Sequence, residues 1–76
     1  MDKMTKFSND LRKLLIDKVS NHELDLPVEN IKHTLLTFEE VDGVLRYFID
    51  NDIVNKLTKD DINEIESLWQ TFYKKD

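Results

Sequence analysis

The sequence predicts an all-α fold, a compact bundle of about four helices. Apolar residues recur at helical steps of three and four along most of the chain, as is typical of amphipathic helices. The chain contains one glycine and one proline, so few residues interrupt these patterns. With 76 residues, of which 39% are hydrophobic, it is long enough for one small core. We therefore expect a single helical domain over residues 1–76.

The first helix is predicted over residues 5–20, with Thr5 or Ser8 near its start. Charged residues occupy the side opposite its apolar stripe. That stripe consists of Met4, Phe7, Leu11, Leu14, Leu15 and Val19.

A second helix is predicted over residues 27–36. Pro27 suits the first turn, because an N–H group there has no helical partner, and Asp25 lies where a capping side chain is expected. The apolar residues again step by three, four and three, at Val28, Ile31, Leu35 and Phe38.

A third helix is predicted over residues 38–51. Thr37, with Glu40 three positions later, has the form of a capping box. Residues 50–52 are polar turn formers and should end the helix. Residues 52–57 fit either a continuation of this helix or a separate turn. The inner face is expected to consist of Val41, Val44, Leu45, Phe48 and Ile49.

The fourth helix, predicted over residues 59–75, has the clearest signals. Thr58 is placed to cap it, and acids at its start with bases at its end match the helix macrodipole. We expect its apolar stripe to dock on the other helices and form the core. The stripe consists of Ile62, Ile65, Leu68, Trp69 and Phe72.

The composition excludes several classes of protein. Without cysteine there is no disulfide scaffold, thiol nucleophile or cysteine-based zinc site. No signal peptide and no membrane-spanning stretch are recognisable, so we expect a soluble, cytoplasmic protein that does not act at a membrane. Alanine is absent while lysine, asparagine, isoleucine and aspartate are abundant, which favours an A/T-rich coding source such as a low-GC bacterium or its phages.

Catalysis and metal binding have little support in the sequence. The two histidines, His22 and His33, lie eleven positions apart, and only Glu29 is spaced to share a helix face with His33. A zinc site needs three or four convergent ligands. Gly43 is the only glycine, so there is no phosphate-binding glycine loop. We expect no enzyme activity, no cofactor and no metal.

The distribution of charge along the chain indicates which kind of partner the protein could bind. Residues 1–38 carry six bases and six acids, whereas residues 39–76 carry five bases and ten acids. The second half should therefore repel phosphate and attract a basic surface. This disfavours nucleic acid, although the second and third predicted helices have the order of a helix-turn-helix. The remaining basic face is that of the first helix, with Lys3, Lys6, Arg12, Lys13 and Lys18.

A partner-binding surface is predicted on the third helix. Tyrosine and arginine are enriched among the residues that dominate binding energy, and acids there suit a basic partner. A glycine inside a helix is unfavourable, and close approach of another backbone would explain it. The predicted surface consists of Glu39, Glu40, Asp42, Gly43, Arg46 and Tyr47.

Two short patches resemble a known family. Asn21-His22-Glu23-Leu24, after an amphipathic first helix, and Thr58-Lys59-Asp60-Asp61-Ile62, leading to Trp69, are similar to segments of the epsilon antitoxins of epsilon–zeta systems. The resemblance implies a small acidic helical bundle whose first helix blocks a kinase-like toxin. It transfers no individual functional residue, and the interval between the two patches is longer here.

These observations favour a small, non-catalytic protein that binds and inhibits or regulates another protein. An antitoxin, an inhibitor, or a phage or mobile-element accessory factor would fit this description. Two alternatives remain open: a transcriptional regulator of helix-turn-helix type, and a structural homodimer.

Overall fold

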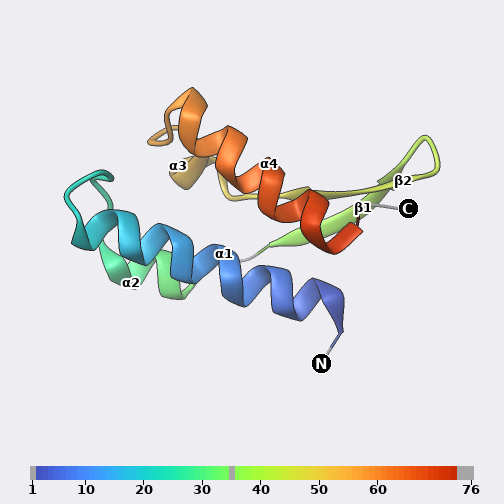
Figure 1. Ribbon diagram of the computed structural model, residues 1–76, viewed down its shortest axis with the longest axis horizontal. Coiled ribbons are helices and arrows are strands. Elements are labelled where there is room, and N and C mark those ends of the chain that lie inside the picture. The colour runs from blue at the N-terminus through green and yellow to red at the C-terminus, as the bar shows by residue number, and fades with distance from the viewer. Residues whose placement is uncertain (1, 35, 74–76) are drawn as a thin grey trace.

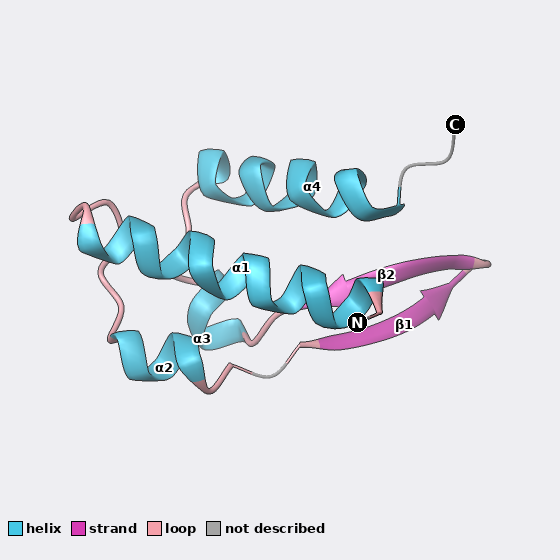
Figure 2. Ribbon diagram, turned by 60° about the horizontal axis from the view of Figure 1, so that its bottom comes forward, coloured by secondary structure: helices cyan, strands magenta, loops and turns pink. Residues whose placement is uncertain are grey.

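Two long antiparallel helices and a β-hairpin make up most of the computed structural model, which describes residues 2–34 and 36–73. The hairpin packs against one half of the helix pair, and two short helices pack against the other half (Figures 1 and 2). In chain order the elements are α1 (Lys3–Ser20), α2 (Val28–Lys32), β1 (Thr37–Val41), β2 (Val44–Phe48), α3 (Asn51–Val54) and α4 (Lys59–Tyr73).

The all-α prediction is wrong, because the segment predicted as a helix over residues 38–51 forms the hairpin. β1 and β2 pair antiparallel with Val41 opposite Val44, Glu39 opposite Arg46 and Thr37 opposite Phe48. Thr37 therefore begins a strand instead of capping a helix. The β-branched and aromatic residues of this segment suit a pleated sheet as well as they suit one face of a helix.

The backbone conformation of Asp42 and Gly43 favours the hairpin over a helix. Both have positive φ, 54° and 80°, as a two-residue type I′ turn requires. Such a turn matches the twist of the strands that it joins. A Cβ added at Gly43 would meet no atom within 4 Å, so glycine serves the backbone conformation and not the approach of another chain segment.

The bounds of the two long helices agree closely with their predictions, but Met4 and Ile62, which were expected in the buried stripes, are exposed. α1 ends at Ser20 as expected but begins at Lys3, because Asp2 and not Thr5 or Ser8 supplies the cap, its Oδ1 accepting the Thr5 N–H at 2.7 Å. α4 begins at Lys59 and is described as far as Tyr73. The predicted last residues, 74 and 75, lie outside the described residues.

The short helices differ more from expectation. α2 covers only Val28–Lys32, and Pro27 precedes it as the N-cap residue. Phe38, expected to continue its stripe, lies instead on β1, and Leu35 is outside the described residues. The segment left open at residues 52–57 contributes to a separate short helix, α3, where Asp50 Oδ1 accepts the Asp52 N–H at 3.1 Å.

An aromatic cluster joins the hairpin to both long helices. Phe7 on α1 is fully buried, and its ring lies 4.9 Å from Trp69 on α4 and 5.1 Å from Tyr47 on β2, between centroids. The Trp69 ring also contacts those of Tyr47, at 5.0 Å, and Phe38, at 5.9 Å. The remaining buried apolar residues extend this core toward α2 and α3: Leu11, Leu15, Leu24, Leu26, Ile31, Ile53 and Ile65.

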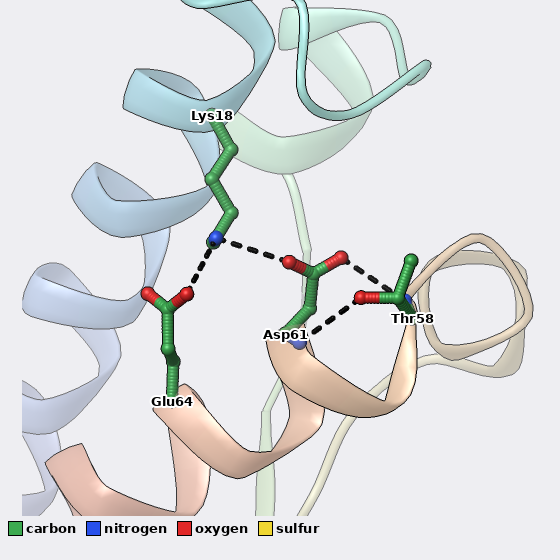
Figure 3. Close-up of polar contacts among 4 residues, drawn as sticks. All are labelled: Lys18, Thr58, Asp61 and Glu64. Atoms are coloured by element: carbon green, nitrogen blue, oxygen red, sulfur yellow. Dashed lines mark hydrogen bonds and ion pairs between the residues drawn. The ribbon is translucent and has the colours of Figure 1, made fainter.

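A charged cluster ties α1 to the start of α4 (Figure 3). Thr58 and Asp61 form a reciprocal cap: the Asp61 N–H donates to Thr58 Oγ1 at 3.1 Å, and Asp61 Oδ2 accepts the Thr58 N–H at 3.0 Å. Lys18 Nζ donates to Glu64 Oε1 at 2.9 Å and lies 3.0 Å from Asp61 Oδ1. Lys18 and Asp61 are buried, so each needs the other's charge.

The cluster shifts the ionisation of its members. The Thr58 backbone N–H, followed by hydrogen bonds from Lys18 and the Thr58 hydroxyl, holds the pKa of Asp61 below its usual 3.8 despite burial. Hydrogen bonds to Glu64 and Asp61 raise the pKa of Lys18 above its usual 10.5. Both charged forms are thus favoured in the folded protein.

Replacing Trp69 by Ala should lower the free energy of unfolding by about 3–5 kcal/mol, because it leaves a large cavity between the hairpin and both long helices. Urea unfolding followed by far-UV circular dichroism measures the loss. Met4→Ala, at a residue 39% exposed, is the control and should change stability by less than about 0.5 kcal/mol. Equal effects of the two changes would contradict the packing described.

Stability should fall in acid through Asp61. Its lowered pKa in the folded state means that its contribution is present above the usual value of 3.8 and is lost as the pH falls through the folded pKa. Urea unfolding at pH 7 and at about pH 3 should show a smaller acid-induced loss for Asp61→Asn than for the wild type. Asp60→Asn removes a neighbouring exposed acid and should retain the wild-type loss; an identical loss in all three proteins would contradict this assignment.

Candidate functional site

The histidines lie apart and belong to local structure. His22, with a φ of 59°, occupies the left-handed position that ends α1, where its N–H donates to the Val19 carbonyl at 3.1 Å. His33 Nε2 lies 3.5 Å from Glu29 Oε2 in an exposed pair. Within residues 2–34 and 36–73, no group of three or more His, Cys, Asp or Glu side chains is arranged to hold a metal ion.

The hairpin carries all six residues of the predicted partner-binding surface. It distributes them differently from a helix, because successive residues of a strand point to opposite faces. Glu39 and Arg46 oppose each other on the face directed away from the helices, which we call the outer face. Asp42 and Gly43 form the turn, and Glu40, two residues before it on β1, opposes Leu45 on the other face.

Tyr47 belongs to the other, inner face and is only half-buried there. Its ring packs on Phe7 and Trp69, and its hydroxyl donates to Glu66 Oε2 on α4 at 2.8 Å. Burial, followed by this hydrogen bond to a carboxylate, raises the pKa of Tyr47 above its usual 10.0. The Tyr47 side chain therefore connects the hairpin to the helices, whereas Arg46 beside it is exposed.

The outer face also presents apolar residues that the helical pattern places in a core. Val44 is 56% exposed, Phe48 42% and Val41 40%. The register places Val41 beside Val44 at the turn end and Phe48 beside Thr37 at the other end, with Glu39 and Arg46 between them. The signal that would have revealed this face is Asp42-Gly43, a preferred pair for a two-residue hairpin turn, between two segments with β-branched and aromatic residues.

Both strands are edge strands. The sheet consists of β1 and β2, and across the described ranges no third strand pairs with either of them. Natural proteins commonly cover or charge such edges, because unpaired N–H and C=O groups bind other extended chains. The hairpin turn also projects past the described end of α4 (Figure 1).

The basic face predicted on the first helix is smaller than expected. Lys18 is buried in the cluster with Asp61 and Glu64. Arg12 is half-buried, and its Nη2 donates to the Thr34 carbonyl at 2.7 Å, beyond the end of α2. The helix-turn-helix alternative loses its second helix altogether, because that segment is β1 and β2.

No family model, no curated protein and no solved structure matches this chain. In the described part of the chain, none of the helices has the length and apolar character needed to cross a membrane.

Replacing Gly43 by Ala should change the stability in opposite directions for a hairpin and for a helix. At a φ of 80° an alanine is strained, and stability should fall by about 1–2 kcal/mol. In a helix the same change would raise stability by about 1 kcal/mol. Thermal unfolding provides the measurement, and Asp42→Asn is the control, because asparagine tolerates the left-handed conformation and should leave stability almost unchanged. A gain in stability for Gly43→Ala would contradict the turn.

Proposed function

We propose that this protein is a non-catalytic binding protein that uses its β-hairpin to bind, and thereby inhibit or regulate, another protein. The observation that carries the proposal is the outer face of the hairpin, where Val41, Val44 and Phe48 are exposed around Glu39 and Arg46. Single exposed apolar residues are ordinary, but Val41 and Val44 are adjacent in the register and share one face with Phe48.

The composition of this face fits the centre of a protein interface. Aromatic residues and arginine are enriched among the residues that contribute most to binding, and here Phe48 and Arg46 lie two positions apart on one strand. The hairpin also carries Glu39, Glu40 and Asp42 against a single base, which supports a partner with a basic surface.

Inhibition or regulation is the role proposed for this binding. The chain is small and acidic, with a net charge of −5, and the epsilon antitoxins that its two short patches resemble act by binding another protein. The hairpin departs from the helical bundle that this resemblance implies. We therefore propose the hairpin, and not the first helix, as the binding element.

Affinity capture with paired variants tests the proposal. The 76-residue chain is immobilised and exposed to extract of the native host, and captured proteins are identified by mass spectrometry. A protein retained by the wild type should be lost with Val41→Glu/Val44→Glu, which places charge on the outer face. The control, Asn63→Glu/Ser67→Glu, adds the same charge to exposed positions of α4 and should retain it.

Thermal unfolding must first show that both double variants fold. A partner retained equally by the hairpin variant and the wild type would contradict the proposed binding element. A host extract that yields no protein dependent on the hairpin would contradict the proposed function.

A further inference from the structure

A groove runs along the edge of β2, between this strand and α4. It consists of two adjoining hollows of about 250 and 280 Å³ that share Tyr47. Their strand wall is residues 44–48 of β2, from both faces of the sheet, and none of the lining residues belongs to β1, which places the groove at the edge of β2. Beyond the strand, the second hollow is also lined by Ile49, Asn51, Val54 and Leu57. Their helix wall includes Ile62, Glu66 and Gln70. We call this feature the β2 groove.

The strand wall offers backbone hydrogen-bonding groups. In an antiparallel pair, alternate residues direct their N–H and C=O groups to the partner strand and the others direct them away. A two-residue turn makes Val41 and Val44 a hydrogen-bonded pair. Leu45 and Tyr47 therefore direct their backbone groups toward the open edge, where an added strand would bind them.

The residues of the helix wall are spaced along α4 almost as alternate residues are spaced along an extended chain. Ile62, Glu66 and Gln70 are four residues apart, so each step rises about 6 Å along α4. Alternate residues of a β-strand advance about 6.6 Å. Three alternate side chains of an added strand can thus face these three residues in turn, because the helix and strand spacings differ little over so short a length.

The chemistry of the helix wall specifies those side chains. Ile62, 43% exposed, lines its hollow together with Ile49 and Ile65, so an apolar side chain directed toward α4 would cover it. One step along, Glu66 accepts hydrogen bonds from the Tyr47 hydroxyl at 2.8 Å and from Gln70 Nε2 at 3.2 Å. Its carboxylate has further lone pairs and no cation within ion-pair distance among the described residues, which suits a Lys or Arg of the added strand.

We propose that the β2 groove binds an extended segment of another protein, which adds a strand to the edge of β2. Facing α4, this segment carries an apolar residue over Ile62 and, two positions away, a Lys or Arg at Glu66. The inference rests on the proposed function and specifies its partner: the hairpin recognises an extended, basic and apolar segment.

A second copy of this chain fits the groove less well. Two β2 strands that pair antiparallel about a two-fold axis centred on Arg46 would place two arginines side by side on the outer face. Like charges directly opposite each other destabilise strand pairing. The residues that a second β2 would turn toward α4 are Leu45, Tyr47 and Ile49, none of which can pair with Glu66.

Selection from a phage library of random ten-residue peptides tests the pattern directly, with the 76-residue chain as the target. Enriched peptides should share an apolar residue and a Lys or Arg two positions apart. Enrichment at helical spacing, or no enrichment, would overturn the inference.

The most enriched peptide, labelled with a fluorophore, is then the probe for variants in anisotropy titrations. Glu66→Gln keeps the shape of the side chain and should raise the Kd about three- to tenfold. Asp60→Asn removes one charge from the same helix outside the groove and should leave the Kd unchanged. Equal effects of the two changes would overturn the role of Glu66.

Strand addition has its own signature. Leu45→Pro removes an N–H directed to the open edge and should abolish peptide binding while the β1–β2 pairing persists. If that variant fails to fold, amide hydrogen exchange on the wild type replaces it. Peptide binding should then slow exchange at Leu45 and Tyr47; unchanged exchange at both amides would overturn strand addition.

The two proposals fail in different ways. If Val41→Glu/Val44→Glu abolishes capture of a host protein while Glu66→Gln and Leu45→Pro leave capture intact, the β2 groove is overturned and the hairpin remains the binding element. If none of these variants affects capture, the proposed function fails as well.

Discussion

The packing of Trp69 and Phe7 on the inner face of the hairpin is the interaction on which the rest of the structure depends. A two-stranded hairpin is at best marginally stable in water, and it needs a helix or further strands against one face. Here the rings of Phe38 and Tyr47 supply that face, and those of Phe7 and Trp69 cover it. Because the rings pack on one face in this way, the other face is left exposed at Val41, Val44 and Phe48.

The charged cluster of Lys18, Asp61 and Glu64 fixes the opposite end of the helix pair. Removing one partner of a buried ion pair leaves an unpaired charge, so the cluster ties α1 to the first turn of α4. The two ends of the molecule thus have different means of stabilisation, aromatic packing at the hairpin and charge pairing at the start of α4. This arrangement places α4 beside β2 and so forms both walls of the β2 groove.

Sequence reasoning succeeded where one periodicity was unambiguous. The Thr58 cap and the stripe through Ile65 and Trp69 define α4, and both are present in the structure. It failed over residues 38–51, because the β-branched and aromatic residues there fit helical steps of three and four but suit a pleated sheet as well. Asp42-Gly43 decides for the hairpin, since both of its residues have positive φ. The six predicted site residues stayed together on the hairpin, but the exposed Val44 and Phe48 were assigned to a core, because the change of period exchanges inner and outer positions.

The most direct test of this account is the NMR nuclear Overhauser spectrum of the wild-type protein. The hairpin predicts cross-strand contacts between the Hα protons of Phe38 and Tyr47, and between those of Glu40 and Leu45, the pairs that face each other without backbone hydrogen bonds. Both contacts should be strong. Their absence, together with the i to i+3 contacts of a helix through residues 38–50, would contradict the hairpin and with it the β2 groove.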